Sequence, residues 1–211
     1  MTVTPLDRRS VRREATRAEI VAAAWELARE QGLSGLSMRD LGERVGMRAQ
    51  SVYTYFASKD EIYDAMFRQG YEEFIDYLTT DGAPALPPLE RVRAHAHRFF
   101  LFCTTDPVRY QLLFLRTIPG FEPSPESYAV AVAALQRMHD DLADLGVDDP
   151  QAGDLATALF TGLVSQQIAN EPGGSRWLRL VDRAASMLLS EVAPHLIHRT
   201  PPAPSRKKAR A

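Results

Sequence analysis

The sequence predicts an all-α protein of about nine helices. Apolar residues recur at helical spacing along most of its 211 residues, and strand-like alternation is nearly absent. Helix starts are also marked, because Thr16, Ser37 and Ser58 each precede an acidic residue by three positions, the spacing of a capping box. The predicted helices cover residues 17–31, 38–45, 49–56, 59–79, 88–105, 107–116, 125–145, 150–170 and 176–196.

Turn-forming residues separate these helices. Gly32 and Gly146 stand where a left-handed C-terminal cap is expected. Asp106 and Asp149 are each followed by proline, which pairs a capping acid with the residue favoured at the first helical position. The stretch 81–88 is rich in proline and predicts a linker after the first four helices.

The linker divides the chain into unequal parts. We expect one domain over residues 16–76, a second over 77–198, and a disordered basic tail over 199–211. The net charge is −2, yet the first 17 residues hold five arginines against only Asp7 and Glu14. An acidic body with basic ends suggests that a polyanion contacts the ends alone.

Composition and motifs exclude several classes of protein. No run of 18 apolar residues predicts a membrane span, and no apolar segment follows the basic N-terminus as it would in a secretory signal. Cys103 is the only cysteine, which fits a reducing cytoplasm. The sequence contains no G-x-S-x-G, GxGxxG, Walker or H-E-x-x-H motif, so we expect neither an enzyme nor a cofactor.

The two short helices 38–45 and 49–56 predict a helix-turn-helix covered by helix 17–31. Gly46 supplies the turn, and the small Gly42 lets the second short helix approach the first. On the wheel of 49–56, Ala49, Val52 and Phe56 point to the core, while amide and hydroxyl side chains point to solvent.

Such an exposed edge suits a DNA major groove, and nearby cations suit phosphates. Arg39, Arg48 and Lys59 could also be ordinary solvated charges, and Tyr53 could be half-buried core. The predicted DNA-binding residues are Ser37, Arg39, Arg48, Ala49, Gln50, Ser51, Tyr53, Thr54, Tyr55 and Lys59.

Residues 16–76 resemble the TetR family of bacterial transcriptional regulators. The resemblance rests on I-x-x-A-A-x-x-L-A-x-x-x-G from Ile20, S-M-R-D-L-G-x-x-V-G-M from Ser37, and S-V-Y-T-Y-F-x-S-K-x-E-I from Ser51. It implies that 49–56 is the recognition helix and that Tyr53, Tyr55 and Lys59 contact DNA. Gly42 and Tyr55 depart from the family's usual alanine and histidine.

The resemblance also implies a helical body that binds a small molecule and dimerises through its last two long helices. Helices 150–170 and 176–196 are apolar over more than one stripe, so a partner subunit is one source of burial, and packing within one subunit is another. We therefore expect a homodimer, most simply a repressor released from double-stranded operator DNA by a small apolar ligand. A constitutive DNA-binding protein, with a filled body, is the alternative.

An aromatic-rich set of side chains in the body is the candidate ligand site, although helical aromatics more often belong to a core. His95 and His97 point apart on one helix, so no metal site is expected. The candidate ligand-binding residues are Phe99, Phe100, Phe102, Cys103, Tyr110, Phe114, Phe121, Tyr128, Met138, His139, Phe160 and Gln167.

Overall fold

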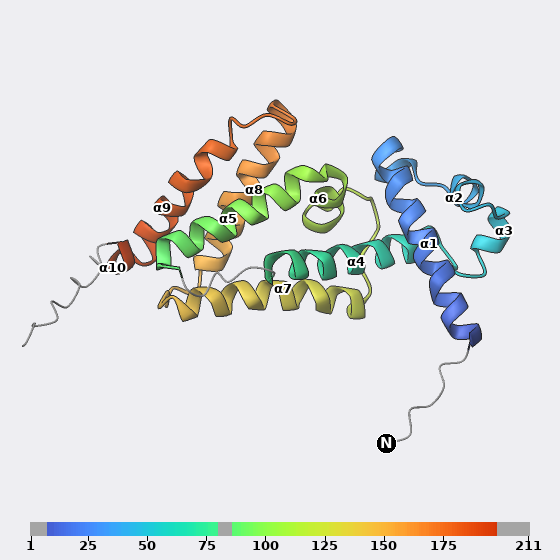
Figure 1. The fold of residues 1–211 in the computed structure, drawn as a ribbon, viewed down its shortest axis with the longest axis horizontal. Helices are drawn as coiled ribbons and strands as arrows, with labels where there is room; N and C mark the ends of the chain where they lie inside the picture. Colours follow the sequence, from blue (N-terminus) through green and yellow to red (C-terminus); the bar gives the residue numbers. More distant parts are fainter. Residues whose placement is uncertain (1–7, 80–85, 198–211) are drawn as a thin grey trace, which may run out of the picture.

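The computed structural model describes residues 8–79 and 86–197, and every regular element within these ranges is a helix, as the sequence predicted. Figure 1 shows an elongated molecule with α1, α2 and α3 at one end and α9 and α10 at the other. The elements are α1 (Arg8–Gln31), η1 (Leu33–Gly35), α2 (Met38–Arg44), α3 (Ala49–Val52), α4 (Lys59–Thr79), α5 (Pro88–Thr105), α6 (Pro107–Phe114), α7 (Pro125–Asp144), α8 (Ala152–Asn170), η3 (Leu178–Leu180), α9 (Val181–Val192) and α10 (Pro194–Ile197).

The first three helices and the start of α4 enclose a small core, and we call this part the head. Ile20 of α1 and Leu41 of α2 are fully buried, and so are Val52 and Phe56 around the end of α3. Burying a side chain of this size contributes about 1.5–3 kcal/mol. These contacts hold two helices that are too short to be stable alone.

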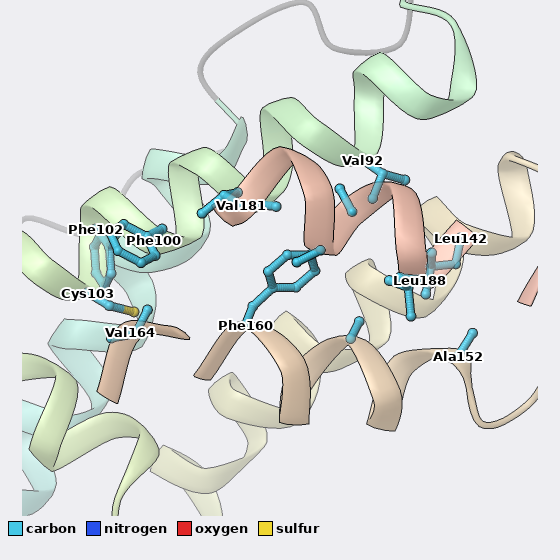
Figure 2. Close-up of a cluster of buried hydrophobic side chains, with 14 of the residues drawn as sticks. Val92, Phe100, Phe102, Cys103, Leu142, Ala152, Phe160, Val164, Val181 and Leu188 are labelled. Atoms are coloured by element: carbon cyan, nitrogen blue, oxygen red, sulfur yellow. The ribbon is translucent and has the colours of Figure 1, made fainter. Parts of the chain in front are cut away.

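The remaining helices form the body around a second core. Figure 2 shows Phe100 and Cys103 of α5 packed near Val164 of α8, with Phe160 and Leu188 further along. Helix α7 lies along α4 and is fixed there through Asp64, whose carboxylate accepts hydrogen bonds from Ser124 and Ser127.

Helix α4 belongs to both cores. Ile62 and Met66 pack in the head, whereas Phe67 and Phe74 pack in the body. The helix runs unbroken through position 76, where the sequence suggested a domain boundary. One continuous helix therefore contributes side chains to both cores.

Helix α1 begins about nine residues earlier than predicted. The capping box assigned to Thr16 is not formed, because Thr16 lies inside the helix and its hydroxyl donates to the carbonyl oxygen of Arg12. By contrast, the predicted cap at Ser37 is present, since its Oγ accepts from the N–H of Asp40 at 3.1 Å. Asp106 likewise caps α6.

Two other helices are shorter than predicted. Helix α3 ends at Val52 because the next N–H groups of Thr54 and Tyr55 bond to carbonyls three residues back, which tightens the chain into turns. The last predicted helix breaks before Pro194, which has no N–H to donate and starts α10 instead. The predicted linker 81–88 lies mostly outside the described residues, and the predicted tail lies wholly outside them.

Candidate functional site

The turn between α2 and α3 is held by two glycines. Gly46 has a φ of 68°, in the left-handed region that favours glycine. A Cβ on Gly42 would lie 2.7 Å from the carbonyl oxygen of Met47 and 3.0 Å from the amide nitrogen of Ala49. The backbone of the turn therefore rests on α2, as the small size of Gly42 predicted.

Packing of α3 on the head leaves a polar edge in solvent. Val52 and Phe56 face inward, whereas Gln50, Ser51 and Thr54 are exposed. The side chains of Ala49, Tyr55 and Ser37 are half-buried at its margins, and Tyr53 is 46% exposed. Together, α3 and the turn after it offer an amide, two hydroxyls and a phenol along this edge, which are the groups that bond to base edges and phosphates.

The three predicted cations differ in exposure and in the groups that they contact. Arg48 is exposed, and Arg39 is exposed but forms an ion pair with Glu43 at 2.9 Å. Lys59 is half-buried, with its Nζ 5.6 Å from the ring centroid of Tyr63. An exposed pair such as Arg39–Glu43 is weak, so its guanidinium can exchange the carboxylate for a phosphate.

Two further arginines at this edge were missed from the sequence. Arg13 and Arg17 of α1 donate hydrogen bonds to the backbone carbonyls of Thr54 and Tyr55. The guanidinium of Arg17 also lies 4.0 Å from the ring centroid of Phe56. These contacts were missed because the helix was predicted to start only at residue 17, after the run of arginines.

The body contains a cavity of about 480 Å³ between α4, α5, α7 and α8. Helix α4 contributes Tyr71, Phe74, Ile75 and Leu78, none of which was predicted, because every candidate was taken from residue 99 onward. The predicted ligand-binding residues that line the cavity are Phe99, Phe114, Tyr128, Met138 and Phe160. Phe121 lies apart, on a smaller cavity of about 150 Å³ that Phe114 and Tyr128 also line.

The other predicted ligand-binding residues lie outside both cavities. Phe100, Phe102 and Cys103 are buried in the body core, where burial raises the pKa of the Cys103 thiol and keeps it neutral. The Tyr110 hydroxyl bonds to Ser165, and burial raises its pKa. Gln167 accepts from the N–H of Trp177, and His139 packs against Gly153.

One end of the larger cavity is polar. Arg91 is buried and its Nη2 lies 2.8 Å from Asp141 Oδ1, while His95 Nδ1 lies 3.7 Å from the other oxygen of the same carboxylate. Burial lowers the pKa of His95, a shift that Asp141 opposes, so the ring is neutral near pH 7. The cavity is therefore mainly apolar, with a charged pair at one end and the exposed Arg137 at its margin.

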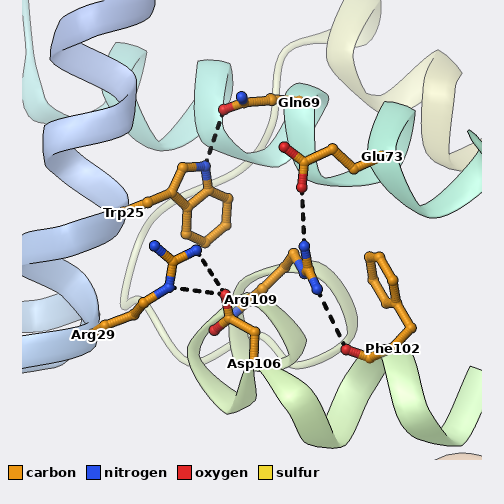
Figure 3. Close-up of polar contacts among 7 residues, drawn as sticks. All are labelled: Trp25, Arg29, Gln69, Glu73, Phe102, Asp106 and Arg109. Carbon is orange, nitrogen blue, oxygen red and sulfur yellow. Dashed lines mark hydrogen bonds and ion pairs between the residues drawn. The ribbon is translucent and has the colours of Figure 1, made fainter. Parts of the chain in front are cut away.

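Polar contacts join the head to α6, which borders the cavity through Phe114 (Figure 3). Arg29 of α1 donates through Nε and Nη2 to Asp106, at 3.0 and 2.8 Å. Trp25 Nε1 donates to Gln69 of α4 at 3.0 Å. The Asp106 carboxylate also caps α6, so one acidic side chain fixes both the start of α6 and the end of α1.

Two searches of the described residues bear on other classes of site. No group of three or more His, Cys, Asp or Glu side chains in the described ranges is arranged to hold a metal ion. None of the helices in these ranges has the length and apolar character needed to cross a bilayer.

The structure thus joins a helix-turn-helix head to a helical body that contains a cavity. Residues 20–66 match the family described as bacterial regulatory proteins, tetR family. The matched residues lie within the segment 16–76, whose motifs resemble that family.

Known proteins resemble the chain over different lengths. The HTH-type transcriptional regulator Rv1816 of Mycobacterium tuberculosis is 30% identical over 139 residues, which are 63% of this chain and 59% of the relative. The HTH-type transcriptional repressor Rv1353c of the same species is 26% identical over 141 residues, 67% of this chain and 52% of the relative. The chain thus covers less than two thirds of the length of these curated relatives.

A solved structure resembles most of the fold. The transcriptional regulator FadR from Bacillus subtilis, in complex with stearoyl-CoA, aligns with a TM-score of 0.65 over 82% of this chain and 97% of its own. The sequence identity is 18%, so this likeness concerns the fold.

Proposed function

We propose that the protein is a homodimeric transcriptional repressor that leaves its operator when a small apolar ligand enters the body. The observation that carries the proposal is that one continuous helix, α4, contributes to the head core and lines the cavity. The proposed function has no catalytic step, and a repressor that acts on operator DNA would work in the bacterial cytoplasm.

The head supports binding to duplex DNA. The α3 edge presents Gln50, Ser51 and Thr54 to solvent, and Arg48 and Lys59 stand on either side of it in the sequence. An α-helix fits the major groove, where an amide can pair with adenine and hydroxyls can bond to several base edges. Base contacts would come from α3 and phosphate contacts from the surrounding cations.

Exposed apolar side chains on α8 and α9 support a homodimer. Leu155 of α8 is 44% exposed and Met187 of α9 is 57% exposed. Between Leu155 and the end of α8, the solvent-facing stripe continues with Ala158 and Gly162, and nothing lies within 4 Å of a Cβ placed on Gly162. Small residues on an open apolar face allow two copies of α8 to approach closely around a two-fold axis.

The cavity supports the ligand. Its volume of about 480 Å³ lies within the roughly 300–1,000 Å³ of small-molecule sites, and most of its lining is apolar. FadR, which shares the fold, is described in complex with stearoyl-CoA. An apolar chain, such as an acyl group, is therefore the first ligand class to test, with its polar end near Arg91 or Arg137.

Two helices connect the cavity to the head. Tyr71 of α4 lines the cavity and donates its hydroxyl to the carbonyl of Leu113 in α6 at 2.9 Å. The α6 cap, Asp106, is in turn bonded to Arg29 of α1. A ligand that displaces Tyr71 or Phe114 would shift α4 and α6 together and change the spacing of the two heads in a dimer.

A constitutive DNA-binding protein is the second candidate. That function requires a filled body, and a cavity of about 480 Å³ disfavours it. Relatives named as repressors, such as Rv1353c, support repression rather than activation of transcription.

A cavity-filling substitution tests the proposal. Ala131→Trp places a large ring where α7 lines the cavity, and Ala133→Trp places the same ring on the exposed side of that helix. An operator is first obtained by selection from random duplex DNA. Operator binding by each variant is then measured with and without each member of a panel of acyl-CoA esters. We expect wild type and Ala133→Trp to release DNA with an acyl-CoA, and Ala131→Trp to stay bound. Equal responses in both variants would contradict a ligand site in this cavity.

A further inference from the structure

The first turns of α1 carry a concentrated positive charge that α2 and α3 do not account for. Residues 8–17 contain five arginines and one acidic residue, Glu14. All side chains from Arg8 to Ala15 are exposed, and Ile20 is the first buried residue of the helix. These turns complete no core, so packing within the chain does not explain them.

Contacts in the head fix where this charge lies. Arg13 Nη2 donates to the carbonyl oxygen of Thr54 at 3.0 Å, and its guanidinium lies 5.5 Å from the ring centroid of Tyr55. Arg17 bonds to the carbonyl of Tyr55 itself. The start of α1 is thus tied to the chain that follows α3, and Figure 1 shows its first turns at the same end of the molecule as α3.

We propose that the arginines in the first turns of α1, Arg8, Arg12 and Arg13, are a second DNA contact that binds the phosphate backbone beside the groove entered by α3. The inference rests on the proposed DNA binding and extends it to a surface outside the helix-turn-helix. Within the described residues, Arg8 and Arg12 form no ion pair, and Arg13 uses only Nη2 toward Thr54.

Phosphate is the partner that fits these arginines. A guanidinium presents a planar set of N–H donors that matches phosphate oxygens, and duplex DNA carries about one charge per 1.7 Å of its axis. The α1 backbone rises roughly 14 Å from Arg8 to Arg17, at about 1.5 Å per residue, so several phosphates lie within reach. The contact would add affinity without reading sequence.

The test is the salt dependence of DNA binding by the double variant Arg8→Gln/Arg12→Gln. The probe is a duplex of arbitrary sequence about 40 base pairs long, several helical turns. Each lost phosphate contact lowers the log–log slope by about 0.9, so two contacts in each subunit of a dimer lower it by up to about 3.6. Arg68→Gln/Arg116→Gln is the matched control, because it removes the same charge from two exposed arginines elsewhere. We expect the control to keep the wild-type slope.

Two further experiments distinguish a DNA contact by these arginines from a structural role in the fold. Arg8→Lys/Arg12→Lys keeps the charge and should restore most of the slope, and the melting temperatures of all variants should agree with wild type. On the selected operator, extending the duplex by about one helical turn at each end should tighten wild type but not the Gln double variant.

Several results would overturn the inference. One is a wild-type slope in the folded Gln variant, and another is an equal loss in the control. A loss that Lys fails to restore, with a lowered melting temperature, would make the arginines structural. Preferential binding of wild type to anionic vesicles, with an unchanged DNA slope, would assign these arginines to a membrane surface. If wild type binds no DNA, the proposed function itself fails. If wild type binds DNA and the Gln double variant binds it with the same salt slope, only this inference fails.

Discussion

The head and the body differ in how closely their apolar side chains are packed. In the head, Ile20, Leu41, Val52 and Phe56 are fully buried, and Gly42 lets backbone touch backbone. In the body, the aromatic side chains of α4, α5 and α6 meet edge to face, as Phe74 does with Phe114 at 5.5 Å, and yet border an open space. The close-packed head has a single arrangement of its helices, whereas the body contains a cavity that a small molecule could enter.

This difference predicts where each part tolerates change. A close-packed core transmits any loss of volume into the whole structure. A side chain beside a cavity already lacks neighbours on one side and loses fewer contacts when it is shortened. Mutations in the head should therefore affect stability and DNA binding together, and mutations around the cavity should affect ligand response first.

The largest expected effect comes from Phe56→Ala in the head. Phe56 is fully buried, so the substitution should lower the free energy of unfolding by about 3–5 kcal/mol. Phe160→Ala, on the cavity wall, should cost about 2–3 kcal/mol, because the space beside the ring is already open. Urea denaturation of both variants at one protein concentration measures the difference. A larger loss for Phe160→Ala would contradict the comparison.

The next effect concerns the contact between the two parts. Arg29→Gln leaves the Asp106 carboxylate, whose side chain is 10% exposed, without its ion pair, which should cost about 1–3 kcal/mol. Because this contact joins α1 to α6, the variant should also show a smaller ligand effect on operator affinity.

The matched control for that variant is Arg116→Gln. It breaks a pair in which both side chains are at least 77% exposed, so its stability should change by less than about 0.5 kcal/mol. Equal unfolding free energies for the two variants would show that the Arg29–Asp106 contact has no special role.

A smaller effect separates two kinds of DNA contact within the head. Lys59→Ala should weaken binding to all sequences alike and lower the salt slope by about 0.9 per subunit, since it removes a phosphate contact. Gln50→Ala should relax base preference and leave the slope near wild type. Salt titrations on the operator and on an unrelated duplex distinguish them, and an unchanged slope for Lys59→Ala would remove it from the interface.

The smallest effect concerns His95 in the body, which faces Asp141 of α7 and lies near Arg91 and Arg98 of its own helix. Burial lowers its pKa below the ordinary 6.5, so as pH falls through that value the unfolded chain takes up a proton before the folded one does. The stability contributed by neutral His95 is full above 6.5 and declines below it. The stability of His95→Gln should therefore fall less than that of wild type between about pH 7 and pH 5. A parallel decline would show that other groups set the pH dependence.

Sequence patterns were informative where one local rule determines the structure. The cap at Ser37, the turn at Gly46 and the inward side of α3 all follow from short-range chemistry, and the structure contains each of them. The start of α1 was missed because an exposed basic segment has no apolar periodicity to mark it as helix.

The cavity was only partly predictable. Periodicity indicates which residues face inward, but it does not tell a filled interior from a hollow one, because that depends on how α4, α5, α7 and α8 meet. Phe99 and Phe100 are neighbours in the sequence, and yet only Phe99 lines the cavity. Tyr71 and Phe74 were overlooked because the candidate ligand-binding residues were all taken from residue 99 onward.

The most direct test of a link between the two parts is a reciprocal binding measurement. The affinity of the protein for its selected operator is measured with and without a saturating acyl-CoA, and the affinity for the acyl-CoA is measured with and without saturating operator. Coupled sites must change each other's affinity by the same factor, and a tenfold effect corresponds to about 1.4 kcal/mol. We predict that both affinities weaken by one common factor. An acyl-CoA that binds in the cavity while both affinities stay unchanged would contradict the account.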